Sequence, residues 1–162
     1  MKALVLYQPW ATLMAIGVKR NETRGRPWEY DGDVAICAAR QKLGDDVPDS
    51  YMPGLQRLWD HRDLVGVYAS NIRDLYCALP FGAVVCVVHK IGCRSTNDTN
   101  ANDPSLTAME LDCGDYSSNR FYYPTGNCRR LVTPVPVVGR QFVFDLPPDV
   151  EAKVLATLRA QA

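Results

Sequence analysis

Residues 17–24 (GVKRNETR) place three cations, one carboxylate and one hydroxyl within eight positions. Lys19, three residues before Glu22, can neutralise a phosphate or, when desolvated, lose its proton and serve as a base or activate water. Glu22 can accept hydrogen bonds from the exocyclic amine of a cytosine-like base, or it can be held by Arg24 in an ion pair. The stretch is therefore either the wall of a pocket or a solvated turn.

Two elements must position this stretch. Lys2 to Tyr7 (KALVLY) predicts a short strand, and Pro9 suits the first turn of a helix that follows it. The side chains of that helix follow the i, i+3, i+4, i+7 spacing of one helical face, at Trp10, Leu13, Met14 and Gly17. The helix is expected to end near Gly17, which turns the chain and places Lys19 at the mouth of a cleft.

The segment after this turn is expected to be extended. A period of two along Arg20 to Arg24 puts Arg20, Glu22 and Arg24 on one face of the chain, with Asn21 and Thr23 on the other. The charged side chains are therefore sorted to one side, as the wall of a concave site requires.

Two residues at the start of the first helix have alternative roles. Trp10 can offer a flat face on which a base stacks, or it can be an ordinary core residue, as its helical spacing alone indicates. Gln8 can hydrogen-bond a base edge or cap the helix. Both alternatives stay open for each residue.

A second group of polar residues lies far along the chain. Tyr116, Ser117 and Arg120 belong to the stretch DYSSNR, in which tyrosine and arginine can stack on a base or bind phosphate. The same composition is typical of an exposed β-turn.

Apolar runs separated by turn-forming residues predict a fold of mixed strands and helices. Asp33 to Ala39 and Gly82 to Ile91 are expected to be buried strands, the second one central in the sheet because it is rich in β-branched residues. Residues 53–76 mix apolar and charged positions, which predicts a helical insertion at about 43–78. The polar residues 96–104 predict a mobile surface loop.

The second half completes the predicted architecture. Separate short strands are expected at 120–123, 128–131 and 141–145, and an amphipathic helix at about 148–160. These elements predict one α+β domain over residues 1–162, built on a small, partly closed mixed β-barrel with flanking helices.

Composition excludes several functional classes. Eighteen Lys plus Arg balance eighteen Asp plus Glu, so no net charge attracts a long duplex, and nucleic-acid contacts must be local. The six cysteines form no CxxC pair and there are two histidines, so neither a structural metal nor a cofactor is expected. No signal segment or long apolar span is present, which favours a reducing cytoplasm and no membrane contact.

The opening residues carry a family resemblance. Residues 4–39, which contain QPWA followed by Gly17, Lys19, Glu22 and Arg24 in a GxKxxExR pattern, resemble the start of ASCH (activating-signal-cointegrator homology) domains. The segments GAVVCVV, GDYSSNRFYY and PVPVVGRQFVFDLP are similar to bacterial and phage members. The resemblance covers most of residues 1–148; the insertion at 43–78 and the loop at 96–107 are less typical.

The resemblance implies a β-barrel of the PUA-like superfamily and a cleft flanked by the first helix. Relatives bind RNA or modified nucleobases, and some small ASCH proteins are amidohydrolases on N4-acylated cytidine or are described as ribonucleases. In the amidohydrolases a threonine nucleophile lies three residues after the motif lysine. This chain has Glu22 there, and Thr23 is expected to face away, which puts the same mechanism in doubt.

We therefore expect a binding module for a short single-stranded RNA segment or a modified nucleoside. The alternatives are a metal-independent hydrolase that uses Lys19 with a carboxylate, and a protein-interaction domain. Lys19 and Glu22 are the candidate catalytic pair, and the candidate ligand-binding residues are Gln8, Trp10, Lys19, Glu22, Arg24, Tyr116 and Arg120.

Overall fold

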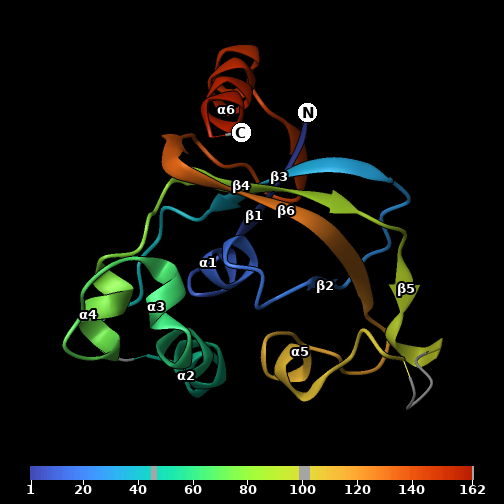
Figure 1. Cartoon of the computed structure of the whole chain (residues 1–162). Coiled ribbons are helices and arrows are strands. Elements are labelled where there is room, and N and C mark those ends of the chain that lie inside the picture. The colour runs from blue at the N-terminus through green and yellow to red at the C-terminus, as the bar shows by residue number, and fades with distance from the viewer. Residues whose placement is uncertain (45–46, 99–102, 162) are drawn as a thin grey trace.

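A curled sheet forms the frame of the molecule and closes into half of a barrel (Figure 1). The computed structural model describes residues 1–44, 47–98 and 103–161, and over these residues the sheet has seven strands in the order β2-β6-β4-β3-β1-β7, with β5 paired to β6. The strands are β1 (Lys2–Leu6), β2 (Asn21–Arg24), β3 (Gly32–Ala38), β4 (Ala83–Lys90), β5 (Arg94–Ser95), β6 (Phe121–Pro136) and β7 (Val143–Asp145).

Strand β4 lies at the centre of the sheet, as its apolar run predicts. It pairs antiparallel with β3 on one side and with β6 on the other, and Val84, Val85, Val87 and Val88 are all buried. Its side chains enter two separate core clusters, one on each face of the sheet. A strand covered on both faces needs no alternation of polar and apolar residues, which explains the GAVVCVV sequence.

The strand β6 corrects one prediction. Separate strands were expected at 120–123 and 128–131, but Phe121–Pro136 is a single strand that curls from β2 to β4. Pro124 does not break it, because the Pro124 carbonyl accepts from the Ile91 amide and its neighbours Tyr123 and Thr125 pair with β2 and β4. The long strand joins the edge strand β2 to the central strand β4 and brings Tyr123 opposite Glu22.

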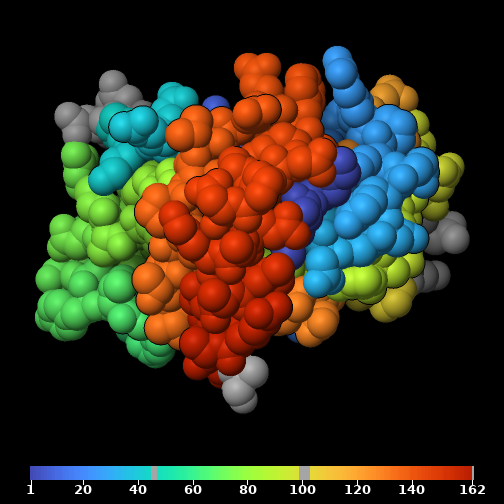
Figure 2. Space-filling model, turned by 90° about the horizontal axis from the view of Figure 1, so that it is seen from above, coloured from blue at the N-terminus to red at the C-terminus, as the bar shows by residue number. Residues whose placement is uncertain are grey.

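Two helices cover opposite faces of the sheet. Helix α1 (Trp10–Ala15) lies in the concave side, where Met14 packs against Leu4, Ile36 and Val88. Helix α6 (Pro148–Ala160), present where the C-terminal helix was predicted, packs Val150 and Val154 on the convex face. Figure 2, which looks onto that face, shows α6 (red) lying across it beside the orange residues of the preceding strands.

The expected helical insertion is present as a group of short helices. It contains a 3₁₀ turn (Asp49–Tyr51), α2 (Met52–Asp60), α3 (Arg62–Val65) and α4 (Ile72–Cys77). Leu55, Leu58 and Leu75 of this group pack with Leu13 of α1 in a third apolar cluster. The insertion therefore supports the side of α1 that faces away from the sheet.

The polar loop at 96–104 differs in part from its prediction. Residues 99–102 lie outside the described residues, whereas Thr96–Asp98 forms a 3₁₀ turn in which Thr96 is buried. Asp103 accepts from Tyr122 Oη at 2.5 Å and pairs with Arg94 at 2.8 Å. Asp103 therefore ties one described end of the loop to β5 and β6, and the Thr96 hydroxyl ties the other end to the carbonyls of Ser117 and Arg120.

Helix α5 (Ala108–Asp112) was not predicted. It has only five residues, too few for a hydrophobic period to show, and Thr107 caps it by accepting from the Glu110 amide. Among the described residues, no helix is long and apolar enough to span a bilayer. All six cysteines carry free thiols.

Candidate functional site

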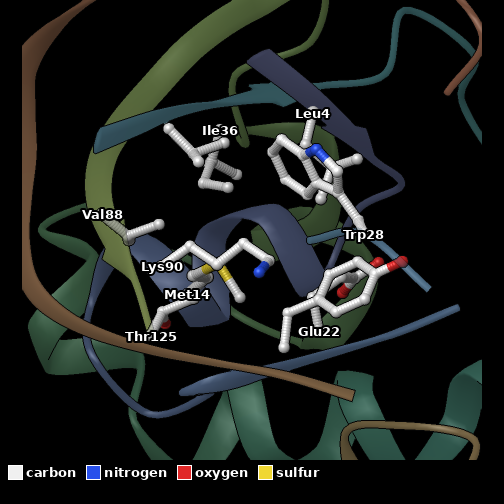
Figure 3. Close-up of a pocket in the computed structure, with 10 residues that line it drawn as sticks. Leu4, Met14, Glu22, Trp28, Ile36, Val88, Lys90 and Thr125 are labelled. Atoms are coloured by element: carbon white, nitrogen blue, oxygen red, sulfur yellow. The ribbon is translucent and has the colours of Figure 1, made fainter. Parts of the chain in front are cut away.

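A small hollow, partly open to solvent, lies inside the curled sheet above α1 (Figure 3). Five strands, α1 and the loop between β2 and β3 contribute the residues that line it: Leu4, Met14, Glu22, Trp28, Val34, Ile36, Val88, Lys90, Tyr123 and Thr125. Its floor is apolar, formed by the inward side chains of β1, β3 and β4 with Met14 of α1. The polar side chains stand on one side, near the loop that joins β2 to β3.

Aromatic rings form one wall of the hollow. Trp28 stacks on Tyr30, with ring centroids 5.1 Å apart and planes at 10°, and meets the edge of Tyr123 at 5.9 Å. The Tyr123 hydroxyl donates to the Arg26 carbonyl at 2.5 Å, which ties the β2–β3 loop to β6. Burial raises the pKa of Tyr123 to about 12, so its hydroxyl stays protonated. These contacts hold the Trp28 indole in a fixed orientation.

Lys90, the last residue of β4, carries a buried ammonium group beside these rings. It is 1% exposed, and its Nζ donates to the carbonyls of Tyr30 at 2.5 Å and Gly92 at 2.6 Å. Nζ also lies 5.3 Å from the Trp28 ring centre and 5.2 Å from that of Tyr123. Figure 3 shows this nitrogen directed toward the side of the hollow where Trp28 and Glu22 lie.

The charge of Lys90 is poorly compensated. Its nearest carboxylate is that of Asp31, at 4.0 Å and largely exposed. Burial therefore lowers the pKa of Lys90 below the ordinary value, although nearby acidic groups oppose the shift. Two carbonyls accept two of its three N–H bonds, so Lys90 can donate one further hydrogen bond.

Glu22 supplies the negative charge of the hollow. Its carboxylate forms an ion pair with Arg24, whose Nε lies 2.9 Å from Oε1, and Lys19 Nζ lies 3.5 Å from the other oxygen. Arg24 also donates to the Val5 carbonyl at 2.7 Å, so the arginine links β2 to β1. As the period of two predicts, Glu22 and Arg24 share one face of β2. The ion pair with Arg24 leaves Glu22 beside the hollow.

Lys19 does not lie at a cleft mouth, which corrects the expected position. It is 2% exposed and is not among the residues that line the hollow. Its Nζ donates to the carbonyls of Asn21 at 2.5 Å and Cys113 at 2.8 Å. With Glu22 at 3.5 Å, all three N–H bonds have partners within the protein. The turn at Gly17 directs the lysine inward, under α5.

Glu110 of α5 is a buried carboxylate that the sequence analysis did not single out. It is 3% exposed and accepts from the backbone amides of Arg20 and of Asn21, the latter at 3.1 Å. Burial raises the pKa of Glu110, while the nearby Lys19 and the two amides oppose the shift. Glu110 thus fixes the start of β2. The only sequence signal was the Thr107–Glu110 spacing of a helix cap.

The two candidates from the QPWA segment have structural partners. Gln8 is buried, accepts from the Thr12 amide at 3.1 Å and donates to the Pro80 carbonyl at 2.8 Å, which supports its capping alternative. Trp10 does not line the hollow with Glu22; its ring packs 4.4 Å from Tyr51 and against Gly54 of α2. Trp10 packs at the border between the sheet cluster, which contains Met14, and the cluster of the helical insertion, which contains Leu13.

Tyr116 and Arg120 lie on the opposite side of β2 from the hollow. The Tyr116 hydroxyl is buried beside Asn21, without a hydrogen bond of good geometry, and its ring lies 5.8 Å from Tyr122. Arg120 donates to the Asp115 carbonyl and pairs with the Asp115 carboxylate at 3.3 Å. The Ser117 carbonyl accepts a hydrogen bond from the Thr96 hydroxyl. These residues form a turn that packs behind β2.

Trp28, Lys90 and Tyr123 were missed as site residues, although weak signals existed. Lys90 is a lysine at the polar end of a strand that is otherwise apolar, and Trp28 lies in a short loop between two predicted strands. A lysine at a strand end is usually solvated, so only the curl of the sheet shows that this one turns inward. Within the described residues, no group of His, Cys, Asp and Glu could hold a metal ion.

Comparisons with known proteins add no assignment. No protein-family model matches the chain, and no curated protein matches it. The site must therefore be interpreted from its own geometry. An aromatic wall, an apolar floor, one carboxylate and one ammonium group surround this small, open-sided space. Such a site suits a small, flat molecule that has both hydrogen-bond donors and acceptors.

Proposed function

We propose that the protein binds one nucleobase, from a short single-stranded RNA segment or a modified nucleoside, in the hollow lined by Trp28, Lys90 and Glu22. The observation that carries this proposal is the pair of opposite charges beside an immobilised indole. Bases in single strands are recognised by stacking on aromatic side chains and by hydrogen bonds to their edges. The hollow supplies both kinds of contact.

The two charged groups favour a base over an apolar ligand. Glu22 accepts hydrogen bonds only, so it suits an exocyclic amine, while the remaining N–H bond of Lys90 suits a ring nitrogen or a keto oxygen. An apolar ligand would leave both groups desolvated without new partners, which costs free energy. Because the chain has no net charge, binding depends on this local site rather than on a broad basic surface.

The same geometry supports the proposal that the chain is an ASCH domain of the PUA-like superfamily. The half-barrel has its first helix in the concave side, and the motif residues Lys19, Glu22 and Arg24 lie in and next to β2, at the edge of the hollow. In this interpretation the motif carboxylate contacts the ligand, and the motif lysine and arginine hold it in place.

The hydrolase alternative receives less support from the contacts. A base or water activator must be able to exchange a proton with the substrate. Lys19 is enclosed by two carbonyls and Glu22, and Thr23 accepts from the Asp115 amide on the far side of β2. Neither side chain lines the hollow. We therefore favour binding over hydrolysis.

The test is a calorimetric titration of the folded protein with a panel of nucleosides, including acylated cytidines, and a short single-stranded RNA. We expect saturable binding that Trp28→Leu weakens by about 1–3 kcal/mol, the usual contribution of base stacking. Trp59→Leu, in α2, is the matched control and leaves affinity unchanged. If no member of the panel binds, or if the two variants lose affinity equally, the proposal is wrong.

A further inference from the structure

Phe142 combines two unfavourable features. It is an aromatic residue with 62% of its surface exposed, and its backbone has φ of +61°, in the left-handed region that bulky residues rarely adopt. Residues held in such conformations cluster at functional sites, where the surrounding structure maintains them. Packing does not explain the residue, because most of its ring is in solvent.

The ring of Phe142 is covered in part by a cation. The Arg26 guanidinium lies 4.9 Å from the ring centre, and Arg26 has no carboxylate partner among the residues that the structure describes. Arg140, two residues before Phe142, is exposed and also has no carboxylate partner there. An exposed ring with a guanidinium over it, and a second arginine two residues away in the chain, is the composition of a surface that stacks bases and contacts phosphates.

This surface adjoins the hollow through a chain of contacts. Arg26 precedes Trp28 by two residues, and its carbonyl accepts from Tyr123, which lines the hollow. Phe142 directly precedes Val143, which pairs with Leu4 on the hollow's floor. Arg26 therefore adjoins the wall of the hollow, and Phe142 adjoins its floor.

The loop that carries Phe142 is also held in place. A Cβ atom on Gly139 would come within 2.8 Å of Val5, so only glycine permits this close approach of the loop to β1. The Val5 carbonyl is the acceptor of Arg24, the partner of Glu22. A ring presented by a fixed loop loses little freedom when a ligand stacks on it.

We infer that Phe142 and Arg26 form a second stacking platform, which takes the nucleotide next to the base in the hollow when the ligand is single-stranded RNA. The inference rests on the proposed function and makes it specific: the natural ligand is an oligonucleotide rather than a free nucleoside. Phe142 stacks on the neighbouring base, and Arg26 with Arg140 contacts the phosphates on either side of it.

The test compares ligands of two lengths. The four ribonucleoside 5′-monophosphates and the four matching homotetraribonucleotides are titrated into the full chain, with deoxy tetramers and a tetraglutamate peptide as further arms. We expect the best tetramer to bind about 5- to 150-fold more tightly than its monophosphate, the gain typical of one more stacked base. Phe142→Gly abolishes this gain and leaves binding of the monophosphate unchanged.

Phe142→Gly is informative because glycine favours a positive φ, so the variant is expected to be at least as stable as the wild type. A purely structural role predicts the reverse, lower stability with unchanged RNA affinity, and would overturn the inference. Trp59→Leu, which removes the similar Arg62–Trp59 pair at 4.8 Å, is the control and leaves the length effect intact.

The remaining outcomes separate the two proposals. Monophosphate binding without any gain for tetramers overturns the platform alone. Absence of binding by every nucleotide overturns the platform, and it overturns the proposed function as well when the modified nucleosides also fail to bind. If tetraglutamate binds as tightly as the best RNA tetramer, the arginines attract only negative charge. If a deoxy tetramer binds more tightly than the RNA tetramer, the ligand is DNA. Either result contradicts the inference.

Discussion

The two buried lysines, Lys19 and Lys90, show how the same side chain serves two purposes in one small fold. Both are almost fully enclosed, and each donates to two backbone carbonyls. Lys19 also has Glu22 at 3.5 Å and Glu110 nearby, so its charge is compensated within the protein. Lys90 has aromatic rings around it, and its nearest carboxylate is that of the largely exposed Asp31, at 4.0 Å.

The difference lies in what each charge needs. A buried charge that has its counter-charge holds elements together, whereas a buried charge with too few partners is stabilised further by a ligand. Lys19 therefore fixes β2 under α5, and Lys90 is available in the hollow. The predictions below compare the two regions.

Lys19→Met should give the largest effect, a loss of about 3–5 kcal/mol in the free energy of unfolding, because buried Glu110 loses its nearby cation and Glu22 keeps only Arg24. Urea denaturation of the variant measures it. A change below about 1 kcal/mol would show that Lys19 is not the structural lysine that its contacts indicate.

Lys90→Met should leave most of the fold's stability but weaken base binding by about 1.5–3 kcal/mol, the contribution of a hydrogen bond from a charged group. Calorimetric titration of the variant beside the wild type measures this. Unchanged affinity, or a stability loss as large as that of Lys19→Met, would remove the distinction between the two lysines.

Glu110→Gln should destabilise the Lys19 region by about 1–3 kcal/mol. Glu110 accepts hydrogen bonds from two backbone amides, and glutamine, with one oxygen, leaves one of these amides without its acceptor. Ionising Glu110 costs stability, since burial raises the pKa of this carboxyl and the folded state holds its proton to a higher pH than the unfolded chain. Stability therefore falls as pH rises between the ordinary pKa of 4.5 and the raised value. Denaturation curves across this window should show that slope in the wild type and not in the variant.

The smallest effect concerns pH and Lys90. Burial lowers the pKa of Lys90 below 10.5, so between its folded and unfolded values the unfolded chain binds more protons and stability rises with pH. Base affinity falls over the same window, because the ammonium donor is lost. In the wild type, denaturation across this pH window should show stability rising with pH, and titration should show base affinity falling. Both slopes should be absent in Lys90→Met. Slopes of the same sign in the wild type would exclude this role of Lys90.

The sequence predicted the frame of the fold better than its site. The apolar run of β4, the helix α1 and the helix at 148–160 follow from local periodicity, which the structure preserves. The continuity of β6 depends on pairing between distant residues, for which no local signal exists, and the only local signal of α5 is the Thr107–Glu110 cap spacing.

The candidate site also contains residues that local rules place and residues that only the tertiary structure brings together. Glu22 and Arg24 share a face because alternation along a strand is a local rule, and the structure pairs them. Trp28, Lys90 and Tyr123 converge only because the sheet curls, since they lie on separate segments of the chain. Lys19 and Trp10 show the converse: a correct local structure did not reveal which way each side chain faces.

The central claim is that a base stacks on Trp28 rather than on Trp10, and single-tryptophan fluorescence tests it most directly. The protein has three tryptophans, so Trp10→Phe with Trp59→Phe leaves Trp28 as the only one, and Trp28→Phe with Trp59→Phe leaves Trp10. Titration with the nucleoside or short RNA that binds the wild type should quench Trp28 in a saturable manner and leave Trp10 unchanged. Quenching of Trp10, with Trp28 unaffected, would contradict the account.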